Sequence, residues 1–179
     1  MNNLQRVTTF AMLLALGVAL WVLEALFPPP LPVPGAKLGL SNIVVLFTML
    51  FLGGREGIYL AVLRSLLGSL IGGTFLSVGF VMSFGGALAS ALAMAFGLHL
   101  LNRMFSLVGI SIIGAVVHNA AQLILVYLLF VRQPGVLYYL PFLLLAGLVS
   151  GLVTGSILVY LDGRLALTSG LLNVSMEQN

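Results

Sequence analysis

SLVGISIIGAVVHNAAQLILVYLLFV, residues 106–131, is the stretch that decides the fold of this chain. It exceeds the roughly 20 apolar residues that a helix needs to cross a bilayer, and it contains no Asp, Glu, Lys or Arg. His118, Asn119 and Gln122 nevertheless lie near its middle. Polar side chains at that depth persist when they face a bundle interior, a wet cavity or a ligand. The stretch therefore predicts a membrane-spanning helix whose polar face is turned into the protein.

The composition extends this prediction to the whole chain. Of its 179 residues 61% are hydrophobic and 6% are charged, more apolar surface than a soluble domain of this length needs. With short turns the length accommodates about six spans and no second domain. Cysteine is absent, which excludes disulfides and cysteine metal sites. The net charge of +3 comes from scattered residues, so nothing supports nucleic-acid binding.

Residues that stop or turn a helix divide the chain into predicted spans. The breaks are FPPPLPVPGAK, GGRE, GGT, LNRMFS and RQPG, each rich in Gly, Pro or polar residues. We therefore expect an all-α integral membrane bundle of six helices, with a single domain over residues 1–164 and a short tail over 165–179. The expected spans are 7–27, 38–52, 56–72, 76–101, 106–131 and 137–162.

The basic residues of the loops predict the orientation, because cytoplasmic loops carry an excess of Lys and Arg. If the N-terminus is cytoplasmic, two loops on the outside hold Lys37 and Arg132. The inside then holds the larger group, namely Arg6, Arg55, Arg103 and Arg164. We expect a multi-pass protein of a bacterial-type cell membrane with both termini in the cytoplasm.

Arg64 is the least expected residue in this sequence, because it lies near the middle of the span 56–72. A charge at the centre of a bilayer costs at least about 2.5–3.5 kcal/mol on insertion scales. One interpretation is an ion pair with Glu24, which is the single acidic residue in the outer half of a span. The other is that Arg64, with Lys37, binds an anionic ligand, since a guanidinium matches carboxylate and phosphate.

The polar residues of the other spans lie at similar depths in this orientation. His118 and Gln122 are four residues apart and share a helix face, and Asn119 is three residues before Gln122. Asn42 lies near the outer end of its span. The pattern favours a cavity open to the outside, and an interhelical hydrogen-bond network is the alternative. A single His without further ligands makes a weak metal site, and we expect no metal or cofactor.

Small residues recur every four positions on several expected helices. Ala11, Ala15 and Ala19 form such a stripe on the first span, and Gly147, Gly151 and Gly155 form another on the last. Small residues let helix backbones approach closely within lipid, so these faces are expected to pack the bundle. Two further sets lie on the third and fourth spans, namely Gly68 with Gly72, and Gly85, Ala89, Ala93 and Gly97. For the stripe on the first span, the alternative interpretation is that it contacts a partner protein.

A run of prolines lies in the first loop, on the expected outer side. Five of the seven prolines lie between residues 28 and 34, and such a run is extended and semi-rigid. It is either a stiff connector or a lid that brings Lys37 over the outer mouth.

The chain has no P-loop, no aspartate-rich magnesium motif and no paired carboxylates at useful spacing. We therefore expect no enzymatic activity, and transport would need a partner or an ion gradient.

Four motifs, in order, resemble the Gx transporter family, which is also labelled heptaprenyl diphosphate synthase component I. The resemblance runs from about residue 10 to residue 160, over nearly the whole membrane domain. The family is similar to the substrate-binding S components of energy-coupling factor (ECF) transporters. The motifs are PVPGAKLGLSNI (32–43), LRSLLGSL (63–70), GAVVHNAAQL (114–123) and YYLPFLLLAGLVSGLVTG (138–155).

The resemblance implies a six-helix protein that binds a scarce small molecule from outside and docks on a T component and two ATPases. It implies that Ala11, Ala15 and Ala19 form the docking stripe. The residues that we expect to bind a small organic, perhaps anionic, ligand are Lys37, Asn42, Arg64, His118, Asn119 and Gln122.

Two alternative functions stay open. The synthase label implies a non-catalytic membrane subunit of prenyl diphosphate or quinone synthesis, because the metal-binding carboxylates of prenyl chemistry are missing from this sequence. Lys37 and Arg64 would suit a diphosphate in that role. The third interpretation is a structural scaffold whose polar residues only hold the bundle together in the bilayer.

Overall fold

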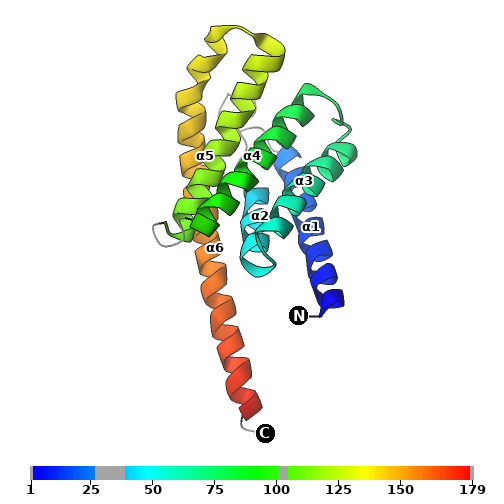
Figure 1. Ribbon diagram of the computed structural model, residues 1–179, viewed down its shortest axis with the longest axis vertical. Coiled ribbons are helices and arrows are strands. Elements are labelled where there is room, and N and C mark those ends of the chain that lie inside the picture. Colours follow the sequence, from blue (N-terminus) through cyan, green and yellow to red (C-terminus); the bar gives the residue numbers. More distant parts are fainter. Residues whose placement is uncertain (1, 27–38, 101–104, 178–179) are drawn as a thin grey trace.

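The computed structural model describes residues 2–26, 39–100 and 105–177, and all regular structure within them is helical. The predicted all-α fold is therefore confirmed. Lys37, Arg103 and the proline run lie outside the described residues. The α-helices are α1 (Asn3–Leu26), α2 (Leu40–Phe51), α3 (Gly54–Ile71), α4 (Val78–Leu100), α5 (Leu107–Val126) and α6 (Leu140–Glu177) (Figure 1). A π-helical turn, η1 (Tyr127–Val131), and a 3₁₀ helix, η2 (Pro134–Tyr139), connect α5 to α6.

Successive helices run in opposite directions through the bundle. In Figure 1 the amino end of α1, the turn between α2 and α3 and the carboxyl end of α6 all lie at the lower end, here called the terminal end. The turn between α3 and α4 and the connection between α5 and α6 lie at the opposite, distal end (Figure 1). This arrangement agrees with an even number of spans.

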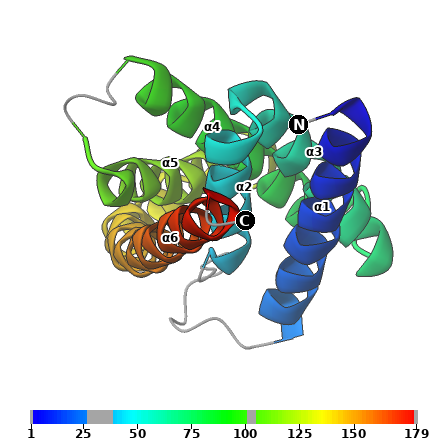
Figure 2. The same ribbon diagram turned by 90° about the horizontal axis from the view of Figure 1, so that it is seen from below.

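Helix α2 occupies the centre of the bundle. It contacts α1, α3, α4, α5 and α6, and Figure 2 shows it lying among them. At 12 residues it is about 18 Å long, shorter than the ~30 Å hydrocarbon core. A helix this short is tolerated at membrane depth because its neighbours, not lipid, surround it. Its carboxyl end lies at the terminal end, so its amino end lies inside the bundle.

The capacity to cross a membrane is unequal among the helices. In the described part of the chain, four segments are long and apolar enough by length and composition. Helix α2 is too short, and α3 contains three charged residues, Arg55, Glu56 and Arg64. The four segments are Asn3–Glu24, Val78–Leu100, Leu107–Val131 and Pro134–Gly163. The protein is a multi-pass membrane protein in which α2 and α3 are stabilised by their packing partners.

Helices α5 and α6 pack backbone against backbone through the predicted glycine stripe. A Cβ added to Gly151 would lie 2.5 Å from Ile112 Cα, and one added to Gly155 would lie 2.7 Å from Val108 Cα. Between these contacts the hydroxyls of Ser111 and Thr154 lie 2.8 Å apart. Close backbone approach combined with a buried hydroxyl contact is how helices associate in lipid. The packing role predicted for this stripe is confirmed.

The glycines of α3 accommodate the single tryptophan of the chain. A Cβ added to Gly68 would lie 2.7 Å from the ring of Trp21, and one added to Gly72 would lie 3.3 Å from it. The indole Nε1 of Trp21 donates a hydrogen bond to the Ser83 hydroxyl of α4 at 3.2 Å. Trp21 thereby links α1, α3 and α4.

Helix α6 crosses the boundary that the sequence predicts between domain and tail. It continues as helix through Glu177, where a separate tail was expected from residue 165. This stretch contains no proline and one glycine, Gly170, so the backbone meets no strong helix breaker after Arg164. The division at residue 164 stays a prediction about packing, but the chain does not leave the helix there.

The contact of Gly151 with the α5 backbone yields a stability prediction. Gly151→Ala is expected to lower the free energy of unfolding by about 1–3 kcal/mol, because a backbone neighbour cannot move aside for the methyl group. The measurement is thermal unfolding in detergent. Gly163→Ala is the matched control, because a Cβ there meets nothing within 4 Å, and it should leave the midpoint unchanged or raise it. Equal midpoints for the two variants would contradict the proposed packing.

Candidate substrate-binding site

Arg64 lies in the middle of α3 and is almost fully buried, with 2% of its surface exposed. Ten residues separate it from Gly54, which places it about 15 Å from the start of α3 at the terminal end. Its aliphatic Cδ packs against Gly17 of α1, where an added Cβ would lie 3.4 Å away. Its Nη2 donates a hydrogen bond to Asn42 Oδ1 at 3.3 Å.

The hairpin formed by α2 and α3 explains why Asn42 meets Arg64. The two helices are antiparallel and joined by a tight turn at Leu52 and Gly53, where Gly53 has a φ of 123°. Asn42 is nine residues before the end of α2, about 14 Å from the turn, which matches the depth of Arg64. Two residues predicted separately for the site are therefore neighbours.

Glu24 does not form the predicted direct ion pair with Arg64. Its Oε1 accepts the backbone N–H of Leu40 at 2.6 Å, and its Oε2 accepts the hydroxyl of Ser41 at 3.1 Å. Leu40 is the first residue of α2, and Gly39 before it supplies no side-chain cap. A carboxylate at a helix amino terminus satisfies unpaired N–H groups and interacts favourably with the helix dipole. Glu24 therefore caps α2 from a different helix.

His118 and Gln122 form the corresponding polar face on α5. A Cβ added to Gly86 of α4 would lie 2.7 Å from Gln122 Cγ and 3.2 Å from His118 Cε1, so the missing side chain lets α4 close over them. Both residues are buried. Gln122 Oε1 has no hydrogen-bond partner among the described residues. A buried acceptor of this kind in a native bundle calls for a partner.

Asn119 is oriented toward α6. Its Nδ2 donates to the backbone carbonyl of Leu143 at 2.9 Å, which supports the interhelical network that the sequence left open as an alternative. Its role in ligand binding stays a prediction. His118, Asn119 and Gln122 lie between about 17 and 23 Å from the start of α5.

The predicted site residues within the described part of the chain lie at similar depths, about 14–23 Å from the terminal end. Helix α2 contacts both α3 and α5, so it lies between the two sets of polar side chains. Lys37 precedes α2 and lies outside the described residues. The set of these buried polar residues is called the polar layer: Asn42, Arg64, His118, Asn119 and Gln122.

Sequence reasoning missed part of the polar interior. Trp21 and Ser83 bond to each other near this layer, and the buried Ser90 hydroxyl has no partner among the described residues. The signal for α1 was present, because Gly17, Trp21 and Glu24 have the spacing of one helix face. That face contacts Arg64, the α3 glycines and the amino end of α2.

The opposite face of α1 carries the predicted alanine stripe of Ala11, Ala15 and Ala19. All three residues are exposed. They line an apolar groove of about 720 Å³ that is closed on one side by Leu67 and Ile71 of α3. The stripe is therefore not used to pack this bundle, unlike the glycines of α6.

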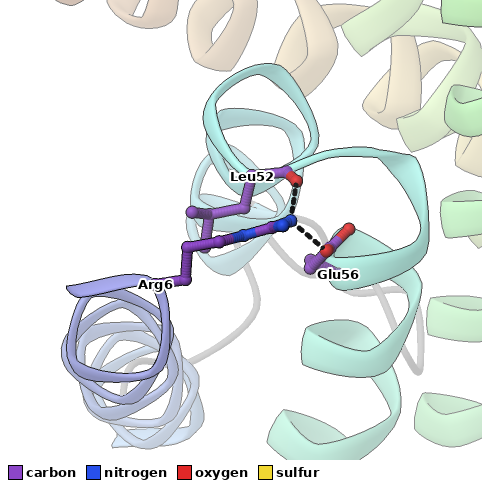
Figure 3. A network of polar contacts seen from close by, with 3 residues as sticks. All are labelled: Arg6, Leu52 and Glu56. Atoms are coloured by element: carbon purple, nitrogen blue, oxygen red, sulfur yellow. Dashed lines mark hydrogen bonds and ion pairs between the residues drawn. The ribbon is translucent and has the colours of Figure 1, made fainter. Parts of the chain in front are cut away.

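A separate polar contact fixes the amino end of α1. Arg6 Nη2 lies 2.6 Å from Glu56 Oε1 and donates to the Leu52 carbonyl at 3.1 Å (Figure 3). This is the ion pair found among the described residues. It joins α1 to the turn between α2 and α3 at the terminal end, far from the polar layer.

Comparison with known sequences places the chain in a family. Residues 13–161 match the profile of the family described as heptaprenyl diphosphate synthase component I. The chain belongs to the heptaprenyl diphosphate synthase component I family. No curated protein matches it. In the described residues no three His, Cys, Asp or Glu side chains gather as potential metal ligands.

This family member shares its fold with a solved transporter subunit. The similar structure is described as "Structure and mechanism of the S component of a bacterial ECF transporter". The match has a TM-score of 0.67 and 22% identity, and it covers 93% of this chain and 98% of the other. The S-component-like fold predicted from the sequence is therefore confirmed.

The capping role of Glu24 is testable by substitution. Glu24→Ala is expected to lower the free energy of unfolding by about 1–2 kcal/mol, because it leaves the amino end of α2 uncapped inside the bundle. Glu24→Gln retains an acceptor and should fall between Glu24→Ala and the wild type. Thermal unfolding in detergent measures the effect, with Asp162→Ala, an exposed acidic residue, as the control. A midpoint for Glu24→Ala equal to that of the control would show that Glu24 does not cap α2.

Proposed function

We propose that this protein is the substrate-binding membrane subunit of a transporter and takes up a small organic compound from outside the cell. The observation that carries the proposal is the polar layer, which lies buried at mid-depth in a fold similar to that of an S component. Ionisable residues inside membrane spans are costly, and they typically mark binding sites and transport pathways.

The proposed site uses the polar layer from both sides of α2. Arg64 and Asn42 supply donors and an acceptor on the α3 side, and His118 and Gln122 supply polar atoms on the α5 side. Asn119 holds α5 to α6 and contributes its remaining amide oxygen. Lys37 adds a positive charge at the entrance. The protein is in this proposal a binding subunit and not an enzyme.

The proposed orientation places the distal end outside. Arg6, Arg55 and Arg164 then lie at the cytoplasmic end, which agrees with the excess of basic residues in cytoplasmic loops. Because α2 begins within the bundle, its amino end lies at the floor of a site that opens toward the outside. The proline run between α1 and α2 is the proposed cover of that opening.

The alanine stripe is the proposed docking surface for a T component that carries two ATPases. The groove beside it is apolar and exposed, and small residues allow close approach of a partner helix. The sequence has no nucleotide-binding motif of its own, and in this proposal the partner ATPases, not an ion gradient, supply the energy for uptake.

The first experiment tests ligand binding. We expect protein purified in a neutral detergent to retain a small organic compound, detectable by native mass spectrometry as a mass that denaturation releases. Asn42→Ala and Gln122→Ala are expected to reduce the bound fraction on the order of tenfold, since each removes a hydrogen bond in a buried site. No bound compound, together with unfolding of Arg64→Ala, would support the structural scaffold instead.

The second experiment tests docking. Ala15→Phe is expected to abolish co-purification with a co-expressed T component and ATPases and to leave the bound compound in place, because the stripe faces away from the polar layer. Val149→Phe places the same phenyl ring at an exposed position of α6 and should not affect assembly. Assembly of Ala15→Phe at the wild-type level would remove the docking surface from the proposal.

The description of the family favours a second candidate function. In it the protein is a non-catalytic membrane partner of prenyl diphosphate synthesis, and the polar layer holds a prenyl diphosphate. Co-purification with a prenyltransferase in place of a T component distinguishes this candidate from the transporter subunit.

A further inference from the structure

Among the described residues Arg64 forms no direct ion pair, and Glu24 interacts with its charge only at longer range. The sequence contains four acidic residues. Glu24 caps α2, and Glu56 pairs with Arg6 at the terminal end. The other two lie toward the carboxyl end of α6, about 33 Å or more along the helix from its start at the distal end. The complete set is Glu24, Glu56, Asp162 and Glu177.

The guanidinium of Arg64 also has unused hydrogen-bond donors. Among the described residues Nε and Nη1 have no partner, although both atoms are buried. Nη2 uses one proton for Asn42 Oδ1. Because the guanidinium is planar, the second N–H bond of Nη2 points parallel either to the N–H of Nε or to one N–H of Nη1. In either case one complete pair of parallel donors remains.

We propose that the ligand of the polar layer carries an oxyanion, a carboxylate or a phosphate, which binds Arg64 through this pair of donors. Arg offers a planar fork that matches the two oxygens of such a group. An intramembrane charge without a counter-ion is the costly case, and a buried ion pair relieves it. This inference rests on the proposed function and names the chemical class of its substrate.

The surroundings of Arg64 favour a bound anion over a solvated cation. The residue exposes 2% of its surface, and Gly17 packs against its methylene groups, so the head group is held in one place. Asn42 binds the guanidinium with a neutral oxygen and does not itself compensate its charge. Because Nε and Nη1 are enclosed by protein atoms, neighbouring side chains must move to admit the oxyanion, while the guanidinium itself stays in place.

The experiment identifies the charge of the compound bound by the purified full-length protein. Compounds released from the wild type, Arg64→Lys, Arg64→Gln and Arg132→Gln are measured by mass spectrometry in both polarities. Arg132 is exposed at the distal end and is the matched control. We expect a carboxylate or phosphate compound whose bound fraction falls on the order of 10- to 100-fold in Arg64→Gln. The loss should be smaller in Arg64→Lys, which keeps the charge but not the fork.

The outcomes separate this inference from the proposed function. A neutral or cationic compound, or an equal bound fraction in Arg64→Gln and Arg132→Gln, overturns the inference and leaves the binding subunit in place. An anionic phospholipid supports the oxyanion at Arg64 but assigns it to the bilayer, which contradicts uptake from outside.

A titration covers the cases in which Arg64→Gln does not fold or no compound co-purifies. The fluorescence of Trp21, the single tryptophan, reports on the turn of α3 next to Arg64, because its ring packs on Gly68. Sodium phosphate and sodium acetate are titrated against sodium chloride at equal ionic strength. A saturable change with either oxyanion that is weaker in Arg64→Lys supports the inference, and a response equal to that of chloride overturns it.

Discussion

Burial of one guanidinium at the middle of an apolar bundle is the constraint on which the rest of this structure depends. Arg64 donates a hydrogen bond to Asn42 and packs closely against α1 at Gly17. The hydrogen bond requires the amino end of α2 to lie inside the bundle, because the first turn of α2 must reach the depth of Arg64. A helix that begins at membrane depth needs a cap that does not come from water, and Glu24 supplies it. The Glu24 carboxylate is thereby held at the backbone of α2 and interacts with Arg64 only at longer range.

Helix α1 connects the two surfaces on which the proposed function depends. One face, with Gly17, Trp21 and Glu24, contacts α3 and the amino end of α2. The other face exposes the alanine stripe. Helix α1 packs mainly on α2 and α3 and reaches α4 through the hydrogen bond from Trp21 to Ser83, so it lies at the edge of the bundle. In the proposed function, a partner that shifts α1 as a rigid body acts directly on Arg64 and on the cap of α2.

The sequence predicts the helices far better than it predicts the polar contacts. Helix positions follow from apolar length and from Gly and Pro breaks, and these are local signals. The depth of Arg64 and His118 follows from the same signals, since the rise per residue is constant. Which carboxylate meets which donor depends instead on the rotation of α1 relative to α2. The pairing of Glu24 with Arg64 was one of two interpretations that the charges left open, and the structure shows no direct contact because Glu24 caps the short central helix.

The stripes of small residues illustrate the same limit. Ala11, Ala15 and Ala19 repeat with the same spacing as Gly147, Gly151 and Gly155, yet one set is exposed and the other is packed against α5. The spacing predicts which residues share a helix face, but it does not predict what packs against that face. The distinction lies in the residue type, because a backbone within 2.5 Å of a Cβ position admits only glycine, whereas alanine keeps a methyl group that a partner can contact.

The two candidate functions differ in the partner protein that they require. A prenyl diphosphate and a small carboxylate both present oxygens to a guanidinium, so an oxyanion at Arg64 is compatible with either function. The lining of the site does not decide between them, because apolar walls are available throughout this bundle. The exposed face of α1 does bear on the choice. An uncovered stripe of alanines within lipid gains little from burial as such, and its value lies in close contact with another helix. The identity of the protein that makes this contact therefore carries more information about function than the site itself.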